Sequence, residues 1–260
     1  MPTPQAGEIE RQRSRLASAE VEDRRDAVQR LGALKRADAS RVALTALRDS
    51  SAIVRATASD AVLSLPPEEA AAALLPLLQD RDEFVRRQTA YALGETRSRT
   101  TVLALAGVLA ADKSAGVRGA AAVALGDIGD EAAATPLIQT LTRRVRADGI
   151  FNRIRRRTTP ENEFVRRAAA HSLGQIKSRA AVPALIAALL DTKTTSDDVR
   201  REAALSLGVI GDPAAIAPLQ SALAAPDPYL SRIAFESLQK LNPAAAMQPA
   251  APLKSSKTKR

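Results

Sequence analysis

The sequence predicts an all-α protein built from about seven copies of a helical hairpin. A short motif recurs about every 31 residues, and the apolar residues are mostly Ala, Leu and Val, with only 2% aromatic residues. Ala and Leu are strong helix formers, and a fixed period of this length is typical of helical repeat proteins. Strand signals are absent, because no segment alternates Val, Ile or Thr with polar residues and no Asn-Gly turn occurs.

The recurring motif contains Val-Arg, two small residues and then Leu-Gly. Clear copies are EFVRRQTAYALGE, AGVRGAAAVALGD, EFVRRAAAHSLGQ and DDVRREAALSLGV. Successive copies are 31, 31, 32, 48, 34 and 31 residues apart. The first motif position is occupied, in chain order, by Asp23, Val54, Val85, Val117, Val165, Val199 and Leu230.

Each copy is expected to form two helices. In VRGAAAVALG the apolar residues fall three and four apart, which places them on one face of a helix. A second, Leu-rich helix follows, with Asp130 or Asp212 as its N-cap and Pro213 at its first helical position. The first helices are expected to end in a left-handed conformation at a glycine, at Gly32, Gly94, Gly126, Gly174 and Gly208.

The motif resembles a known family. The full motif begins with an aspartate, continues with a Val-Arg pair whose arginine lies six residues after the aspartate, and ends with Ala-x-x-Leu-Gly. This pattern is similar to the HEAT repeats of phycobilisome lyases. The resemblance covers residues 18–242 and implies a right-handed α-solenoid of the armadillo type, with Val-Arg helices on its concave face. Residues 1–17 would cap the N-terminus, and the Lys-rich residues 243–260 are expected to form a disordered basic tail.

Composition excludes several classes of protein. The chain has no Cys, so it has no disulfide framework and no thiolate metal site. No apolar run reaches the roughly 18 residues of a membrane span, and the N-terminus lacks the apolar segment of a signal peptide. No glycine-rich loop ends in Gly-Lys-Ser/Thr, as a P-loop does. The sequence therefore predicts a cytoplasmic protein without a nucleotide cofactor.

His171 is the only histidine of the chain. Metal centres need several imidazole and carboxylate ligands, so neither a metal nor another cofactor is expected. The resemblance extends to deoxyhypusine hydroxylases, whose iron ligands are repeated His-Glu pairs, but Ser172 follows His171 here. We expect His171 to occupy a half-exposed position on the Val-Arg helices. The sequence favours a protein that is not an enzyme, and only the resemblance leaves a lyase role open.

An arginine recurs in six copies of the motif. The resemblance implies that these arginines pair with the aspartate six residues earlier, which Asp49, Asp80 and Asp112 provide for three of them. Unpaired arginines would instead form a basic track for nucleic acid. Pro160 and Thr194 stand where the aspartates of Arg166 and Arg200 would be, so these two arginines are expected to be freer. The six are Arg24, Arg55, Arg86, Arg118, Arg166 and Arg200.

The basic charge of the protein lies outside the regular repeats. Residues 143–162 are an enlarged turn with seven arginines against two acids, and residues 243–260 carry four basic residues and no acid. Together they account for the whole formal net charge of +9. Within this basic turn, Ile150, Phe151 and Ile154 fall on one side of a possible helix and arginines on the other, which is typical of a basic amphipathic helix. A second enlarged turn follows at residues 191–197.

The sequence thus predicts a non-catalytic scaffold or adaptor that binds an acidic protein partner. The concave helices and the basic turn would make the contact. One alternative is nucleic-acid binding through the basic turn and the tail, and another is a lyase or lyase-accessory role. The candidate partner-binding residues are Arg143, Arg144, Arg146, Phe151, Arg153, Ile154, Arg155, Arg156, Arg157, Arg166 and Arg200.

Overall fold

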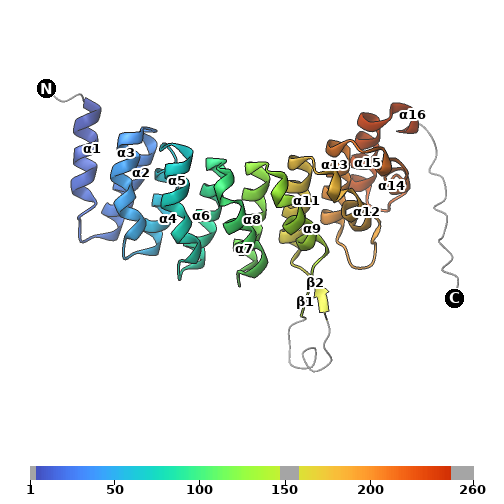
Figure 1. Cartoon of the computed structure of the whole chain (residues 1–260), viewed down its shortest axis with the longest axis horizontal. Helices are drawn as coiled ribbons and strands as arrows, with labels where there is room; N and C mark the ends of the chain where they lie inside the picture. Colours follow the sequence, from blue (N-terminus) through green and yellow to red (C-terminus); the bar gives the residue numbers. More distant parts are fainter. Residues whose placement is uncertain (1–3, 147–157, 247–260) are drawn as a thin grey trace. The chain divides into compact units, whose positions relative to one another are not determined.

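The computed structural model describes residues 4–146 and 158–246 and divides the chain into two compact units. Unit 1 spans Met1–Ala133 and unit 2 spans Ala134–Arg260. The described residues are mainly helical, as the sequence predicts, and their helices form successive hairpins (Figure 1). None of these helices is both long and apolar enough to cross a membrane.

Unit 1 is built from two layers of helices. The Val-Arg helices α2, α4, α6 and α8 pack against one another in chain order, and the Leu-rich helices lie along the other side. Short 3-10 turns extend or precede the Leu-rich helices. The elements are α1 (Pro4–Arg15), α2 (Val21–Ala33), α3 (Ala37–Ala43), η1 (Leu44–Arg48), α4 (Ala52–Ala61), α5 (Pro67–Leu74), η2 (Leu75–Gln79), α6 (Glu83–Thr96), η3 (Arg99–Thr101), α7 (Val102–Ala111), α8 (Ala115–Ile128) and η4 (Glu131–Ala133).

Unit 2 repeats the same arrangement with α11, α13 and α15 as its Val-Arg helices. A two-stranded ribbon, β1 and β2, projects from the end of α9 (Figure 1). The elements are α9 (Ala134–Thr142), β1 (Arg144–Arg146), β2 (Thr158–Pro160), α11 (Glu163–Ile176), η5 (Arg179–Ala181), α12 (Val182–Leu190), α13 (Asp197–Ile210), η6 (Pro213–Ala215), α14 (Ile216–Ala222), α15 (Pro228–Leu241) and α16 (Pro243–Ala246).

The motif valines form the core between the two layers. Val54, Val85, Val117, Val165 and Val199 are all fully buried, together with leucines from both helices of each hairpin. The predicted N-caps are also present, since Asp130 Oδ1 accepts a hydrogen bond from the Ala132 amide and Asp212 Oδ1 accepts one from the Ala214 amide. The helical period and the capping residues therefore describe the hairpins correctly.

The predicted role of the motif glycines is wrong. Gly94 lies inside α6, and a Cβ atom on it would stand 2.7 Å from the Cα atom of Ala124 on α8. Glycine is needed there because neighbouring Val-Arg helices approach closely, not because the helix ends. The left-handed residue comes three positions later, at Arg97, with φ of 53°. Lys177 and Gly211 occupy the same left-handed position in unit 2.

The basic turn begins and ends as β structure, which the sequence analysis did not predict. Strands β1 and β2 pair antiparallel, with Val145 opposite Thr159. These residues are β-branched, which favours strands, but three residues are too few for alternation to be recognised. The amphipathic helix expected around Phe151 and Ile154 lies outside the described residues. The tail expected to be disordered from residue 243 starts instead with the short helix α16.

Candidate partner-binding site

Three motif arginines of unit 1, Arg24, Arg55 and Arg86, connect one repeat to the next. Arg55 donates from Nε and Nη2 to the carboxylate of Asp80, at 2.7 and 2.8 Å, although Asp80 lies 25 residues later. Its Nη1 donates to the backbone carbonyl of Asp49, six residues earlier, at 2.8 Å. The implied pairing with the carboxylate six residues earlier is therefore wrong. Arg24 with Asp49 and Arg86 with Asp112 repeat this geometry.

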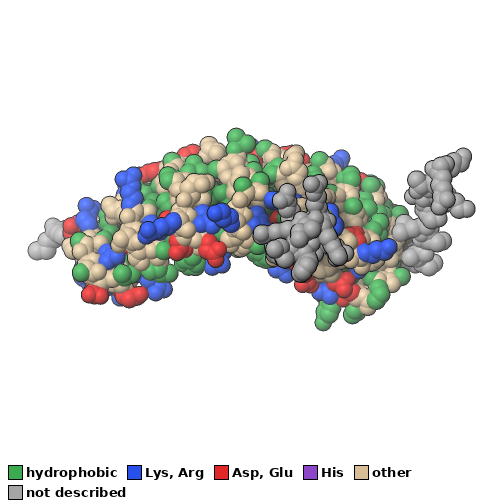
Figure 2. Space-filling view, turned by 90° about the horizontal axis from the view of Figure 1, so that it is seen from below, with side chains coloured by type: hydrophobic (Ala, Val, Ile, Leu, Met, Phe, Trp, Pro, Cys, Tyr) green, Lys and Arg blue, Asp and Glu red, His purple; other side chains and the backbone are tan. Residues whose placement is uncertain are grey.

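We call these three arginine–aspartate pairs the ladder. The ladder side chains are nearly buried, with 9% of Arg55 and 11% of Asp80 exposed. The hydrogen bond from Arg24 holds the pKa of Asp49 below its ordinary value. Two-point bonding between guanidinium and carboxylate favours the charged form of both groups. The ladder is therefore electrically neutral and structural. On the surface of unit 1, too, Figure 2 shows Lys and Arg side chains with Asp and Glu side chains beside them.

Unit 2 departs from the ladder at Arg166. Its guanidinium donates to the Leu141 carbonyl at 3.1 Å, the Thr194 carbonyl at 3.3 Å and the Thr195 hydroxyl at 2.8 Å. All three acceptors are neutral, and among the described residues no carboxylate forms a salt bridge with Arg166. Arg166 is nonetheless 8% exposed, and burial lowers its pKa. Arg166 is thus freer of carboxylates than the ladder arginines, as expected, but backbone carbonyls hold it in place.

Arg200 also differs from its prediction. It is 8% exposed and donates to the Leu189 carbonyl at 3.0 Å and to the Asp197 carboxylate of its own helix at 2.7 Å. The bond to the next repeat is made by its neighbour Arg201, which donates twice to Asp227, at 2.7 and 2.8 Å. Arg200 is thus paired rather than free, and it offers little surface to a partner.

Asp191 explains why Arg166 lacks a carboxylate. It lies 25 residues after Arg166, the separation of Arg24 from Asp49 and of Arg55 from Asp80. Its carboxylate instead accepts hydrogen bonds from the Thr194 and Lys193 amides and from the hydroxyls of Thr194 and Thr195. These bonds, led by that of the Thr194 hydroxyl, lower the pKa of Asp191 to about 2. Asp191 was not among the predicted residues, because its 25-residue separation from Arg166 becomes a signal only once the pairing of Arg24 with Asp49 and of Arg55 with Asp80 is known.

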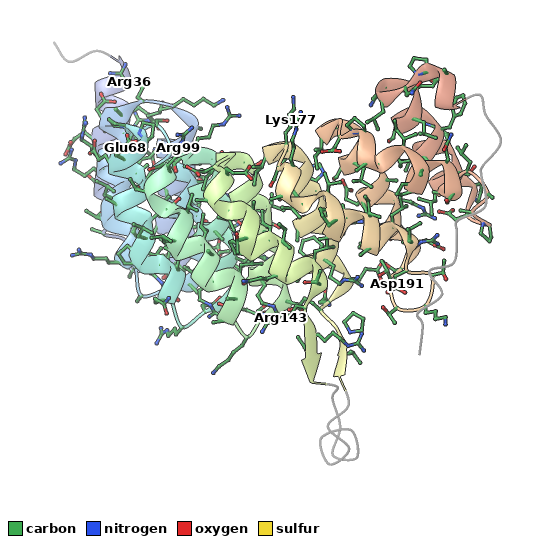
Figure 3. The ribbon with its side chains drawn as sticks, turned by 45° about the vertical axis from the view of Figure 1, so that its right-hand side comes forward. Arg36, Glu68, Arg99, Arg143, Lys177 and Asp191 are labelled. Carbon is green, nitrogen blue, oxygen red and sulfur yellow. The ribbon has the colours of Figure 1, made fainter. Side chains whose placement is uncertain are left out.

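A small cavity lies beside Arg166. Its volume is about 210 Å³, and its wall joins the base of the ribbon, the first turn of α11 and the turn after α12. Arg143 is 3.6 Å from the buried carboxylate of Glu161, while Arg144 is exposed. Figure 3 shows Arg143 and Asp191 at the opposite end of the unit 2 helices from Lys177. The lining residues are Leu141, Thr142, Arg143, Arg144, Pro160, Arg166, Ala184, Ala187, Ala188, Asp191, Thr194 and Thr195.

The remaining candidate residues belong to the basic turn. The backbone of Arg146 ends strand β1, two residues after Arg144. The other candidates lie outside the described residues: Phe151, Arg153, Ile154, Arg155, Arg156 and Arg157. The structure therefore brings together Arg143, Arg144 and Arg166 around one cavity.

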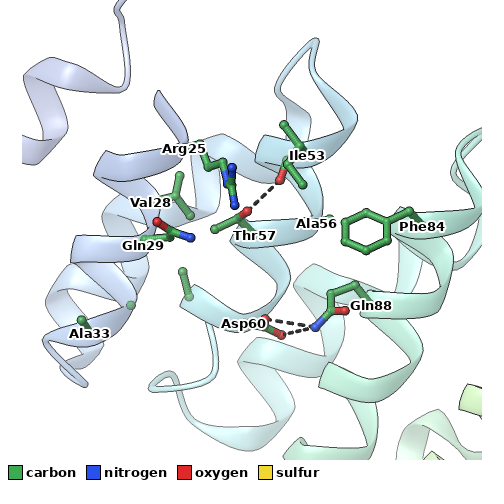
Figure 4. Close-up of a pocket in the computed structure, with 12 residues that line it drawn as sticks. Arg25, Val28, Gln29, Ala33, Ile53, Ala56, Thr57, Asp60, Phe84 and Gln88 are labelled. Atoms are coloured by element: carbon green, nitrogen blue, oxygen red, sulfur yellow. Dashed lines mark hydrogen bonds between the residues drawn. The ribbon is translucent and has the colours of Figure 1, made fainter. Parts of the chain in front are cut away.

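A second hollow, of about 510 Å³, lies on the Val-Arg helices of unit 1 (Figure 4). Val28, Ile53 and Phe84 provide apolar surface from α2, α4 and α6. On its polar side, Gln88 donates to the Asp60 carboxylate at 3.1 Å, and Arg25 Nε is buried without a hydrogen-bond partner. The mixed lining suits contact with a protein side chain, and no nucleophile with an adjacent base is among the residues that line it.

His171 is half-exposed, as expected, with 48% of its side chain accessible. Its Nδ1 lies 2.9 Å from Oε1 of Glu202, which is on the next Val-Arg helix, 31 residues later. Within residues 4–146 and 158–246, no group of three His, Cys, Asp or Glu side chains is arranged to hold a metal. His171 therefore joins two neighbouring helices.

Comparison with known proteins assigns the family. A profile of HEAT repeats matches residues 10–94, 73–152 and 192–255, which is most of the chain. This chain belongs to the HEAT-repeat family. A profile of the phycobilisome-lyase HEAT-like repeat also matches residues 165–191 of this HEAT-repeat protein. No curated protein matches the sequence.

Solved structures share the fold of this HEAT-repeat protein at low identity. YibA of Escherichia coli is 20% identical with a TM-score of 0.61, and the match covers 90% of this chain and 81% of YibA. A chain from the complex of CpcE and CpcF of phycocyanin lyase from Nostoc sp. is 22% identical with a TM-score of 0.52. The match covers 93% of this protein and 89% of that chain. At these identities the likeness concerns the fold, which is a helical-repeat scaffold of the kind that mediates protein interactions.

Proposed function

We propose that this HEAT-repeat protein is a non-catalytic scaffold or adaptor that binds an acidic protein partner. The basic turn of residues 143–162 would be the main contact, with the enlarged turn of residues 191–197 and the Val-Arg helices beside it. The observation that carries the proposal is the position of the excess charge. The basic turn holds a net charge of +5 in twenty residues, whereas the ladder arginines of unit 1 are each paired with a carboxylate.

The paired ladder supports this proposal by removing the competing surface. An arginine that already donates twice to a buried carboxylate cannot turn to a ligand without breaking those bonds. Arg143 and Arg144 lie at the point where the ribbon leaves unit 2, and Arg144 is exposed. A concentrated positive charge on a loop held by a rigid scaffold accelerates association with a negative partner and selects against positive ones.

The hollow on the Val-Arg helices of unit 1 would add a second, weaker contact. Its apolar wall is partly exposed at Phe84, over whose ring the guanidinium of Arg87 lies at 5.3 Å from the centroid. Side chains that combine an aromatic ring with an arginine are common in protein interfaces. A partner seated on the Val-Arg helices could therefore use the hollow for one apolar anchor.

The test is a pull-down with the intact protein beside a variant in which residues 145–160 are shortened to the length of the ordinary turns. We expect the intact protein to recover a partner with a negative net charge and the shortened variant to lose it, while circular dichroism shows unchanged helicity. Shortening a surface loop costs little chain entropy. Equal recovery by both proteins would refute the basic turn as the contact, and preferential retention on DNA would support nucleic acid binding instead.

A lyase-type role is a second candidate because the phycobilisome-lyase repeat profile matches residues 165–191. A chain of the CpcE and CpcF complex of phycocyanin lyase also shares the fold. An assay of bilin attachment to an acceptor protein in the presence of this chain tests the candidate directly. Attachment above the level without the chain would establish the role, and no attachment would leave the scaffold function.

A further inference from the structure

The cavity beside Arg166 has the chemistry of a binding site for a single negative group. We propose that it binds a side-chain or C-terminal carboxylate of the acidic partner, in the place that the next repeat's aspartate occupies beside the ladder arginines of unit 1. This inference rests on the proposed function and names the group that the scaffold recognises in its partner.

Among the described residues, the Arg166 guanidinium forms hydrogen bonds with neutral acceptors alone, unlike the ladder arginines. In unit 1 each ladder arginine donates twice to one carboxylate, at 2.7 and 2.8 Å for Arg55 and Asp80. Arg166 is buried to the same extent but donates only to two carbonyls and a hydroxyl. A buried cation gains most from an acceptor that carries charge. A carboxylate that entered the cavity would therefore strengthen the bonding of Arg166.

The longer turn after α12 is the reason why Asp191 does not pair with Arg166. In unit 1 the aspartate precedes the next motif arginine by six residues, as Asp49 precedes Arg55, whereas Asp191 precedes Arg200 by nine. The three extra residues let Asp191 bind the amides of its own turn. The Thr195 hydroxyl lies between the Arg166 guanidinium and the Asp191 carboxylate. It accepts a hydrogen bond from Arg166 at 2.8 Å and donates one to Asp191 Oδ2 at 3.2 Å. The Asp191 carboxylate therefore binds its own turn instead of Arg166.

The size and charge of the cavity suit a carboxylate. Three arginines and one aspartate line it, which makes its wall positive. Its volume of about 210 Å³ gives room for a carboxylate with a few methylene groups. The exposed Arg144 at the rim would attract the negative group, and Arg166 would bind it.

The experiment measures binding of a fluorescent hexaglutamate peptide to the full-length protein by anisotropy. In the first variant, residues 192–194 are deleted, which restores the six-residue spacing and should return the Asp191 carboxylate to Arg166. The second variant is Arg144→Glu at the exposed rim. Arg179→Glu is the matched control, because Arg179 is exposed at the start of η5, beyond the far end of the 14-residue helix α11, which is roughly 20 Å long.

We expect the intact protein and the Arg179→Glu control to bind alike. The deletion and Arg144→Glu should each weaken binding by about tenfold or more, as the loss of one charged hydrogen bond does. The Nε–H resonance of Arg166 should shift when hexaglutamate is added to the intact protein. The deletion should also raise the melting temperature, which a merely damaged site would not do. Arg144→Glu keeps the test valid if the deletion fails to fold.

Three outcomes would overturn the inference. If hexaglutamate binds the intact protein, the deletion and Arg144→Glu equally well, it binds elsewhere on the basic turn, and the scaffold proposal stands without the cavity. If the intact protein does not bind hexaglutamate at all, the cavity is no carboxylate site, and the pull-down alone decides the proposed function. If inorganic phosphate displaces the peptide at lower concentration than acetate does, the cavity selects phosphate rather than carboxylate.

Discussion

Units 1 and 2 use the same motif arginine in different ways. In unit 1, Arg24, Arg55 and Arg86 each bind the aspartate of the following repeat. In unit 2, Arg166 has no carboxylate partner among the described residues, Arg200 binds Asp197 of its own helix, and Arg201 takes over the bond to the next repeat. The helices that carry these arginines are equally regular, with 14 residues each in α6, α11 and α13.

The turns make the difference. Where the aspartate lies six residues before the motif arginine, its carboxylate faces the preceding repeat and completes the ladder. Where the turn is longer, as after α12, hydrogen bonds within the turn satisfy the aspartate instead. Turn length can therefore decide whether a motif arginine pairs with the aspartate of the next repeat, without any change in the helix that carries the arginine.

The largest expected effect comes from breaking the ladder. Asp80→Asn should destabilise unit 1 by about 3 kcal/mol, because it leaves the buried Arg55 cation without its carboxylate. Asp191→Asn should cost about 1 kcal/mol, since it removes only hydrogen bonds of a turn. Urea unfolding at neutral pH, followed by circular dichroism, measures both. Equal losses would mean that the two aspartates are equivalent and that the comparison of the units is wrong.

A smaller effect is expected from the close approach of α6 and α8. Gly94→Ala should cost about 2 kcal/mol, because the new methyl group would meet the Ala124 backbone at 2.7 Å. Gly107→Ala is the control, since that glycine is exposed on α7 with no atom near its missing side chain. The control should gain up to about 1 kcal/mol from helix propensity. A stabilised Gly94→Ala protein would restore the view that this glycine merely ends a helix.

Acid titration separates the two kinds of aspartate. The pKa of Asp49 is lowered chiefly by Arg24, whereas that of Asp191 is lowered to about 2 chiefly by the Thr194 hydroxyl. Both aspartates stabilise the fold above the ordinary pKa of 3.8, and this stability is lost as pH falls through the folded-state value. Thr194→Val should move the pKa of Asp191 upward and leave that of Asp49 unchanged. Carboxyl chemical shifts followed by NMR report both values, and a fixed Asp191 pKa would argue against its capture by the turn.

The smallest effect is expected at His171. His171→Gln should change stability by less than about 0.5 kcal/mol, because the side chain is half-exposed and its bond to Glu202 lies at the surface. Partner binding should also be unchanged within error. Loss of a measured activity in the folded variant would reopen a catalytic role for this histidine.

Much of the fold follows from the sequence because helical period and capping are local. The motif valines, the caps at Asp130 and Asp212 and the half-exposed position of His171 are as predicted. The ladder pairing is not local. Asp80 lies 25 residues after Arg55 and six before Arg86, so the sequence alone is compatible with either partner. Only the packing of successive hairpins shows that the carboxylate faces backward along the chain.

The candidate site was harder to predict for the same reason. Arg143 and Arg144 are evident as part of a basic turn, but the cavity depends on which hydrogen bonds Asp191 makes. Those bonds follow from three extra residues in a turn 47 positions beyond Arg144. Charge counting thus finds the basic turn, whereas the partner of Arg166 depends on tertiary structure.

The central claim is that the basic turn, and not the paired ladder, carries partner binding. The most direct measurement is the affinity of the recovered partner for the intact protein and for the variant with residues 145–160 shortened, each by calorimetry at low and high salt. We predict that the intact protein binds strongly and loses affinity as salt rises, while the shortened variant binds weakly with little salt dependence. An unchanged affinity and salt dependence in the shortened variant would contradict the claim and would indicate that the partner binds the Val-Arg helices instead.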